Sequence, residues 1–320
     1  MNSDELIQRY QAGQRDFSRL KLTSIELSNI SLEEINLSSA NLLGANLQNV
    51  NLDNANLSNA QLISTEVENT TFRNANLSNA NLEDIAWQNL NLTNADLTDT
   101  YYNYSVIQNS NFTNANLTQI YGYQSSFNNC NFTNANISHA ELSESNIYYC
   151  NLSNVNFSHG IFYEVYIGRS NLSNVDLTHA HIKSISGWSE ANYTNVNFQN
   201  ALYVNRKDLP PDIDPNKLGL MFVGPEADLS GKDLRNIDLS SSDLSTVNFT
   251  NANLTAANLS DTDSTNANFT NANLENADLS SSDLTNANLT NANLNNANLN
   301  NVIFDNTIMP DGNIRNFGSD

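Results

Sequence analysis

A period of five residues organises almost the whole chain. From Phe17 to Ile182 nearly every fifth residue is large and apolar, and Gly122 is the exception. On a straight helix, at about 100° per residue, such residues would drift by about 140° per unit and form no stripe. On a flat strand they would alternate between opposite faces. Only a chain that turns a corner once in every five residues keeps all of them inside.

A longer period of 20 residues sets how many units make one coil. Every twentieth residue from Val67 departs from leucine, in the series Val67, Trp87, Ile107, Phe127, Ile147 and Ile167. The same stride from Leu37 gives only leucines, at Leu57, Leu77, Leu97 and Leu117. Four units of five residues therefore make one coil.

The repeating unit is typified by Ala55-Asn56-Leu57-Ser58-Asn59, with a small residue two positions before the leucine and polar residues after it. This unit resembles the Ala-(Asp/Asn)-Leu-X-X motif of the pentapeptide-repeat family, and it recurs over nearly the whole chain. The resemblance implies an all-β fold, a right-handed quadrilateral parallel β-helix. It also implies a bacterial source of cyanobacterial type.

The pattern divides the chain into five parts. We expect an N-terminal cap helix in 1–16, a first β-helix block over 17–203, an irregular segment over 204–227, a second block over 228–304 and a C-terminal cap or tail over 305–320. Residues Asp4 to Gln11 carry apolar side chains at helical spacing, which predicts a short helix over the first coil. A slip of one residue near Ser186-Gly187 predicts a bulge. The proline-rich segment 204–227 is either an excursion from one solenoid or an elbow between two.

The composition excludes several classes of function. The chain has 34 acidic and 13 basic side chains, a net charge of −21, and such a surface repels nucleic acid. The first residues lack a signal-peptide pattern and no long apolar run follows, so we expect a cytoplasmic protein without membrane association. We also expect no small-molecule ligand and no cofactor.

No catalytic motif is present, so we expect no enzyme. There is no phosphate loop, HExxH, CxxC or nucleophile elbow. Most aspartates stand where asparagine would serve equally, which indicates hydrogen bonds to the corner backbone. An active site would have to lie in 204–227, where Arg206, Lys207, Asp208, Asp212 and Asp214 cluster, and a flexible charged loop explains those residues equally well.

Two ladders of residues 20 apart have more than one interpretation. His139, His159 and His179 are predicted to point outward in one column, with His181 nearby, and could form a metal site, a pH-sensitive stripe or a solvated column. Cys130 and Cys150 occupy the small inward position, at a spacing of about 4.8 Å that permits a disulfide. A reducing cytoplasm favours two buried thiols.

Tyrosines provide the candidate partner-binding site. Eight of the 12 tyrosines are predicted to point outward on two adjacent faces: Tyr101, Tyr104, Tyr121, Tyr123, Tyr148, Tyr149, Tyr163 and Tyr166. Exposed tyrosine on a rigid support is typical of protein interfaces. Alternatively, the rings pack on each other or cover a gap at Gly122.

These observations favour a non-catalytic interaction scaffold, a rigid acidic solenoid that presents its tyrosines to an unidentified protein partner. The alternative is a DNA-mimic-like modulator of a type II topoisomerase, which the family resemblance implies for some members. Blocks of about 45 Å and about 19 Å would need about 26 and about 11 negative charges to match duplex DNA. Residues 17–203 hold 15 acidic and five basic side chains, and residues 226–304 hold ten and two, so only the second block approaches that density.

Overall fold

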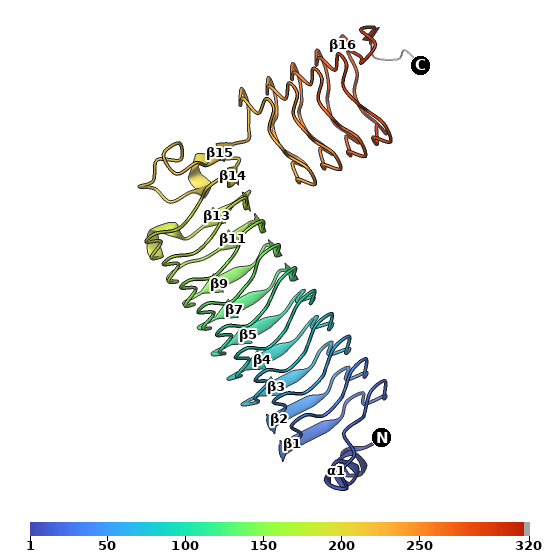
Figure 1. The fold of residues 1–320 in the computed structure, drawn as a ribbon, viewed down its shortest axis with the longest axis vertical. Coiled ribbons are helices and arrows are strands. Elements are labelled where there is room, and N and C mark those ends of the chain that lie inside the picture. Colours follow the sequence, from blue (N-terminus) through green and yellow to red (C-terminus); the bar gives the residue numbers. More distant parts are fainter. Residues whose placement is uncertain (317–320) are drawn as a thin grey trace. The chain divides into compact units, whose positions relative to one another are not determined.

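The computed structural model describes residues 1–316 and shows a parallel β-solenoid (Figure 1). Successive coils pair in steps of 20 residues on four sides, as in Asn36 with Asn56, Asn41 with Gln61, Asn46 with Glu66 and Asn51 with Thr71. The predicted fold class and the four units per coil are confirmed. The chain divides into two compact units, Met1–Met221 and Phe222–Asp320.

The chemistry of the five-residue unit explains the corner. Ala55 and Leu57 are buried and point into the core. The Asn56 side-chain oxygen accepts the Ser58 N–H at 3.0 Å, which fixes the chain direction beyond the leucine. Asn59 then takes a left-handed backbone conformation with φ of 59°, which asparagine tolerates better than most residues. The predicted role of the short polar residues at the corners is confirmed by such hydrogen bonds.

Unit 1 carries two sheets on adjacent sides of the solenoid. The nine-stranded sheet consists of β1 (Glu26–Ser31), β2 (Asn46–Asn51), β3 (Glu66–Glu68), β4 (Ala86–Gln88), β5 (Val106–Gln108), β7 (Ser126–Asn128), β9 (Asn146–Tyr148), β11 (Val165–Tyr166) and β13 (Ile185–Ser186). The six-stranded sheet consists of β6 (Tyr121–Tyr123), β8 (Glu141–Ser143), β10 (Ile161–Tyr163), β12 (His181–Ile182), β14 (Leu202–Tyr203) and β15 (Met221–Phe222). Every pairing in both sheets for which a register is defined is parallel.

Strands form at corners that lack the hydrogen bond between the small inward residue and the carbonyl of the leucine three residues before it. At a tight corner the Ala60 N–H donates to the Leu57 carbonyl at 3.0 Å. After β3 the equivalent residue is Thr70, whose hydroxyl donates to the Glu68 carbonyl at 3.0 Å and accepts the Val50 N–H at 3.2 Å. Serine or threonine at the inward small position therefore replaces the missing bond.

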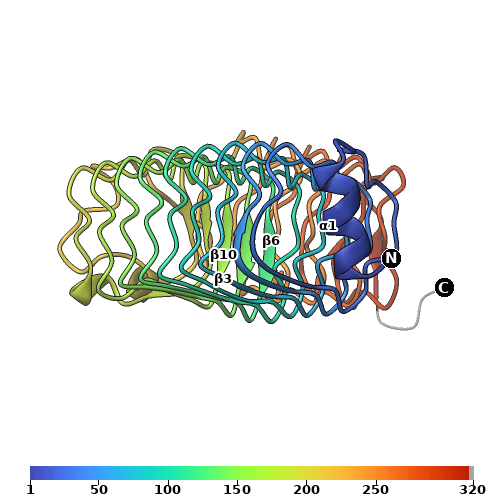
Figure 2. The same ribbon diagram turned by 90° about the horizontal axis from the view of Figure 1, so that it is seen from below.

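The helix α1 (Ser3–Gln11) covers the first coil (Figure 2). The Asn2 side chain caps it by accepting the Glu5 N–H at 2.9 Å. Leu6 is fully buried, and the Tyr10 hydroxyl donates to the Glu33 carbonyl at 2.9 Å. The predicted N-terminal helix is confirmed, and it closes an end that would otherwise expose the core.

The predicted bulge lies just after β13. Gly187 has φ of 88°, a 3₁₀ helix η1 (Trp188–Glu190) follows, and Asn171 then pairs with Asn192, 21 residues later instead of 20. The extra residue is absorbed without breaking the stack of coils.

The segment after β14 folds against the end of unit 1. It contains the 3₁₀ helix η2 (Arg206–Asp208), and the Arg206 guanidinium donates to the carbonyls of Pro210, Pro211 and Ile213. Leu209 and Leu220 are buried in the core of the unit. The Met221 N–H donates to the Ala201 carbonyl at 2.8 Å. Residues 204–221 therefore leave the sheet and return to it in an ordered path. The Arg206 guanidinium supplies hydrogen-bond donors for three backbone carbonyls of this segment.

Unit 2 repeats tight corners from Asp228 onward and ends in a hairpin. The hairpin strands β16 (Thr307–Ile308) and β17 (Ile314–Arg315) are antiparallel, and the Arg315 guanidinium lies 4.5 Å from the centre of the Phe304 ring. Of the predicted C-terminal cap, residues 317–320 lie outside the described residues.

Candidate functional site

The eight predicted tyrosines lie on the outer surface of two adjacent sides of unit 1. Their exposed fractions are greatest at Tyr104 (54%) and Tyr101 (53%), while Tyr123, Tyr148 and Tyr166 are half-buried. We call this surface the tyrosine face: Tyr101, Tyr104, Tyr121, Tyr123, Tyr148, Tyr149, Tyr163 and Tyr166. The parallel register brings residues from four successive coils onto it.

Four of these rings form two pairs near β6. The ring centres of Tyr101 and Tyr121 are 6.3 Å apart, and those of Tyr104 and Tyr123 are 5.6 Å apart in an edge-to-face arrangement. The Gln124 amide donates to the Tyr123 hydroxyl at 3.1 Å. The pairs hold each other's rings in place and leave their edges accessible.

A second group surrounds Arg169. Tyr148 lies 4.1 Å from Tyr149 and 5.8 Å from Tyr166 between ring centres, and the Arg169 guanidinium lies 5.4 Å from the Tyr149 ring centre. Arg169 also donates to the Tyr149 hydroxyl and, at 2.9 Å, to the Glu190 carboxylate.

Hydrogen bonds within this group shift the pKa values of Glu190, Arg169 and Tyr149. The hydrogen bond from Arg169 lowers the pKa of Glu190, and the hydrogen bond to Glu190 raises the pKa of Arg169. Hydrogen bonds from Tyr148 and then Arg169 lower the pKa of Tyr149. The group therefore combines a cation near two aromatic rings with an ion pair to Glu190, and aromatic and arginine side chains are enriched at protein interfaces.

Tyr163 stands apart from both groups. The Lys183 ammonium lies 5.5 Å from its ring centre, and a hydrogen bond with Glu164 raises the pKa of Tyr163. The structure thus places all eight side chains on the predicted faces but gathers them in separate groups.

Two of the tyrosines hold a backbone conformation that their side chains disfavour. Tyr104 and Tyr149 have φ of 57° and 56°, at the corner position where most units carry asparagine. A bulky residue in this region costs about 1–2 kcal/mol relative to its preferred conformation.

Sequence reasoning missed Arg169 and Glu190. The 20-residue stride that aligned the tyrosines also places Arg169 directly beyond Tyr149, so the signal was available. Glu190 lies 21 residues after Arg169 because the bulge intervenes, and a strict 20-residue stride passes it by.

The histidine ladder forms as predicted in geometry. The rings of His139, His159 and His179 stack at 4.8 Å with nearly parallel planes, and His181 is buried nearby. Burial, and then the neighbouring His179 and His139, lower the pKa of His159. In the described part of the chain no group of three or more histidine, cysteine or acidic side chains is placed to hold a metal ion.

The inward cysteines behave as part of the core. Cys130 and Cys150 are free and buried, and the Cys130 N–H points at the Cys150 sulfur, 3.4 Å away. Ser110 and Ser170 occupy the same column and bond the same backbone groups through their hydroxyls. The two thiols therefore take the place of serine at corners that follow a strand, where the side chain accepts the backbone N–H of the neighbouring coil.

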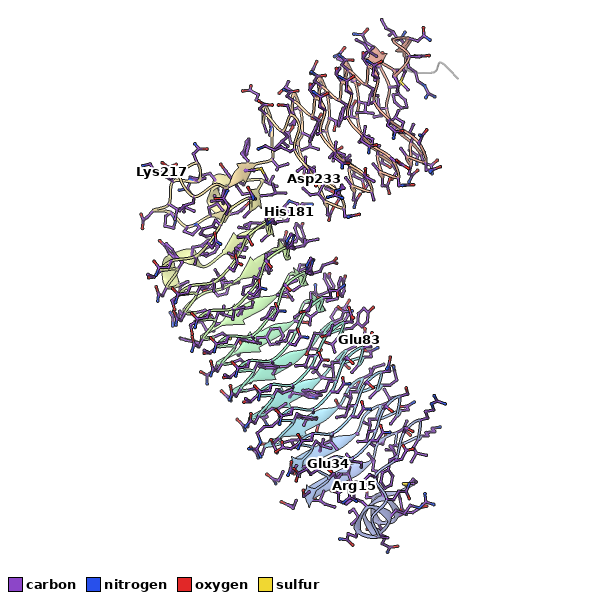
Figure 3. The ribbon with its side chains drawn as sticks, viewed as in Figure 1. Arg15, Glu34, Glu83, His181, Lys217 and Asp233 are labelled. Atoms are coloured by element: carbon purple, nitrogen blue, oxygen red, sulfur yellow. The ribbon has the colours of Figure 1, made fainter. Side chains whose placement is uncertain are left out.

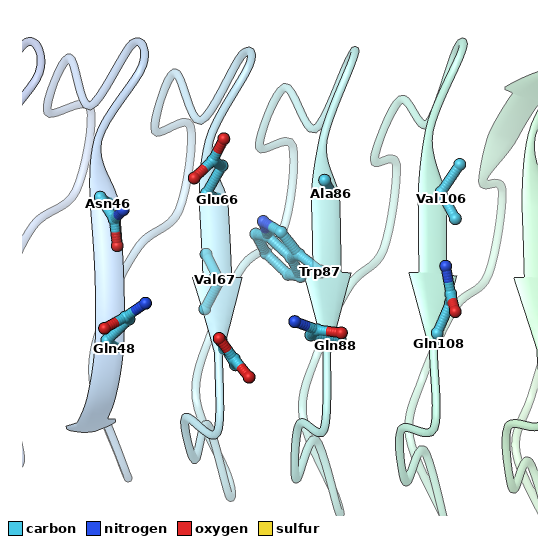
Figure 4. Close-up of a pocket in the computed structure, with 10 residues that line it drawn as sticks. Asn46, Gln48, Glu66, Val67, Ala86, Trp87, Gln88, Val106 and Gln108 are labelled. Carbon is cyan, nitrogen blue, oxygen red and sulfur yellow. The ribbon is translucent and has the colours of Figure 1, made fainter.

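Two further polar features of unit 1 were not anticipated from sequence. A hollow of about 210 Å³ lies on strands β2 to β5 where Ala86 leaves room between Glu66 and Val106 (Figure 4). Elsewhere, the buried carboxylate of Asp53 accepts bonds from Arg73 at 2.7 Å and from Thr71. Burial raises the pKa of Asp53, but these hydrogen bonds outweigh it and hold the pKa below its usual value.

The coils define the class of this protein: a parallel β-solenoid built from five-residue units with a buried leucine at each centre. The family model for pentapeptide repeats matches residues 16–54, 55–86, 75–119, 125–162, 226–255, 248–286 and 282–316, with eight copies. The chain belongs to the pentapeptide repeat family.

The solved structures that the chain matches include those of three proteins. HetL of Nostoc sp. strain PCC 7120, a pentapeptide repeat protein involved in heterocyst differentiation regulation, is 21% identical, covers 98% of this chain and 100% of its own, and has a TM-score of 0.35. QnrB1, a plasmid-mediated fluoroquinolone resistance protein, is 17% identical over 62% and 93%, with a TM-score of 0.25. Rfr23 of Cyanothece 51142 is 19% identical over 51% and 92%, with a TM-score of 0.15.

No curated protein sequence matches the chain. Within residues 1–316, no helix is both long and apolar enough to cross a membrane.

Proposed function

We propose that this chain is a non-catalytic interaction scaffold that binds a protein partner through the tyrosine face of unit 1. The exposed rings of Tyr104 and Tyr149 carry this proposal, because each stays accessible while it packs against a neighbouring tyrosine that fixes its position. The same two rings are among the most exposed aromatic groups of the molecule, at 54% and 49%.

The arrangement fits a partner with apolar and acidic groups. Tyrosine offers a large contact area with few rotatable bonds, so little side-chain entropy is lost on binding. Arg169 and Lys183 lie beside the rings and supply the positive charge that an otherwise acidic surface lacks. We place this role in the cytoplasm, and the two free cysteines are consistent with a reducing compartment.

The test is affinity capture from cells of the source organism with the wild type and with the double variant Tyr104→Asn/Tyr149→Asn. Because asparagine suits the left-handed corner, we expect the variant to melt at the same or a higher temperature while losing the partner. Arg19→Asn changes a residue in the same corner conformation of an early coil and is the matched control. Retention of the same partner by the double variant would show that the tyrosine face is not the binding site.

A second candidate function is a DNA-like acidic surface on unit 2. Asp243, Asp263 and Asp283 pair in register on successive coils and form a column of carboxylates along one side. Like charges at this spacing oppose folding, so their retention favours a role in binding a basic surface. Replacement of all three by asparagine keeps the corner hydrogen bonds. If this role is correct, the wild type changes DNA supercoiling by a type II topoisomerase and the asparagine variant does not.

A further inference from the structure

A groove of about 550 Å³ lies on the last full coil of unit 1, and none of the eight tyrosines of the tyrosine face lines it. One wall is the last coil, with Tyr193, Val196 and Phe198, and the other wall is Ile213 and Leu218 of the excursion. Leu218 is 37% exposed, and Val196 and Phe198 present only their edges. The groove is therefore apolar at its base and open to solvent.

The backbone along this groove has N–H groups in the positions that would pair with a further coil. In the preceding coil, the N–H groups of Leu172, Asn174 and Leu177 donate upward to carbonyls of the last coil at 2.6–2.9 Å. Tyr193, Asn195 and Phe198 hold the equivalent positions in the last coil. Within unit 1, residues 1–221, no hydrogen-bond acceptor meets these three N–H groups.

Two carbonyls complete the pattern. Ser170 and Val175 accept N–H groups from the coil above at 3.0 and 2.9 Å. Their equivalents in the last coil are Ala191 and Val196, whose carbonyls have no donor among the described hydrogen bonds. The edge thus offers three donors and two acceptors at the spacing that two stacked coils use.

The excursion explains why this edge stays open. The chain leaves the solenoid after β14 and returns only at Gly219, whose carbonyl accepts the Asn200 N–H at 2.8 Å. Within unit 1 the returning chain therefore pairs only from Asn200 onward, and no later residue of this unit pairs with residues 192–198. Ile213 and Leu218 stand beside the vacated path and do not fill it.

We propose that this groove binds an extended peptide segment of a partner protein, which adds as a strand to the open edge of unit 1. The unpaired donors and acceptors specify an extended backbone. The coil geometry also specifies the side chains of the bound peptide. Two large apolar residues, five positions apart, would lie above Tyr193 and Phe198. A small residue would stand two positions before the second of these apolar residues.

Charge selects the flanks of that peptide. Asp212 lies at the groove, where its carboxylate accepts the Tyr193 hydroxyl at 3.4 Å. The nearby cations are already engaged, since Arg206 binds three carbonyls and Lys217 pairs with Asp214 at 3.4 Å. Lys217 extends from the outside of the excursion (Figure 3). The Asp212 carboxylate favours a basic residue at the end of the bound segment that lies near it.

The probe is a fluorescent peptide with the chain's own sequence 248–255, Asn-Phe-Thr-Asn-Ala-Asn-Leu-Thr, and a lysine at each end. We expect saturable binding to the full chain in an anisotropy titration. A peptide that is N-methylated at the asparagine before leucine cannot donate to Val196 and should bind at least about tenfold more weakly, which is about 1.4 kcal/mol.

The matched variants are Leu218→Glu, which puts a charge into the groove, and Leu43→Glu, which changes an equally exposed leucine elsewhere on unit 1. Leu218→Glu should lose at least about tenfold in affinity and Leu43→Glu should lose nothing. If circular dichroism shows that Leu218→Glu does not fold, Leu218→Ser replaces it. Absence of saturable binding, equal affinity for the methylated peptide, or equal affinity of the groove variant would each overturn the proposal.

Binding of the peptide to the groove is independent of the tyrosine face. The Tyr104→Asn/Tyr149→Asn variant should bind the peptide with unchanged affinity, because neither residue lines the groove.

Discussion

The interior column that contains Gly122 gives the sharpest prediction about packing. The centres of four successive coils are Tyr102, Gly122, Leu142 and Phe162. Tyr102 is fully buried, and its ring centre lies 5.8 Å from Phe127, which belongs to the next coil. The large ring therefore extends into the coil that holds Gly122, and we expect it to share with Leu142 the space that a leucine at 122 would occupy. A Cβ added at Gly122 would meet the Leu142 side chain at 3.0 Å, which is tighter than ordinary contact.

We predict that Gly122→Leu and Tyr102→Leu compensate for each other. Gly122→Leu alone overfills the core and should cost about 2–3 kcal/mol. Tyr102→Leu alone leaves a cavity and should cost about 1–2 kcal/mol, reduced because a buried hydroxyl is also removed. The double variant restores leucine at both centres and should cost only about 1 kcal/mol, which is a coupling of about 2–4 kcal/mol, at or above the upper end of what residues in contact show.

Urea unfolding followed by tryptophan fluorescence measures this effect. Both tryptophans, Trp87 and Trp188, lie in unit 1, so their fluorescence reports the unfolding of that unit. The three variants should differ in transition midpoint at similar slope. Simple additivity of the two single substitutions would refute the reasoning, because it would mean that the ring of Tyr102 does not occupy the space at Gly122.

Three further predictions concern polar groups of unit 1. Arg73→Met leaves the Asp53 carboxylate buried without its cation and should destabilise by about 1–3 kcal/mol in the same urea assay, whereas Arg9→Met, from an exposed pair of the same unit, should change stability by less than about 0.5 kcal/mol. Because the folded-state pKa of His159 lies below its usual 6.5, the unfolded chain binds the proton more readily; the melting temperature should therefore fall as pH drops below 6.5, and less steeply in His159→Asn. Cys150→Ser should be nearly neutral in thermal melts, whereas Cys150→Ala should cost about 1 kcal/mol, because the Cys130 N–H loses its acceptor; equal stability of the two would contradict the role assigned to the sulfur.

The candidate site was only partly readable from sequence. The stride of 20 residues placed the tyrosines on the correct faces, because in-register parallel coils convert sequence spacing directly into position. Arg169 was readable in the same way and was missed. The strain at Tyr104 and Tyr149 could not be recognised before the left-handed corner had been assigned to the residue two after each leucine.

The sequence by itself determined the local structure of this protein. A buried leucine, a small inward residue and a short polar side chain in every five residues leave the backbone one way to satisfy its hydrogen bonds, so the corner, the coil of 20 and the cap helix follow from spacing alone. The tertiary structure decided everything that depends on contacts outside this repeat. It showed that the charged segment after β14 is ordered, since Arg206 binds three carbonyls that no pattern pairs with it. It also showed that no other part of unit 1 pairs with the N–H groups of Tyr193, Asn195 and Phe198, because the chain leaves the solenoid before it would pass over them.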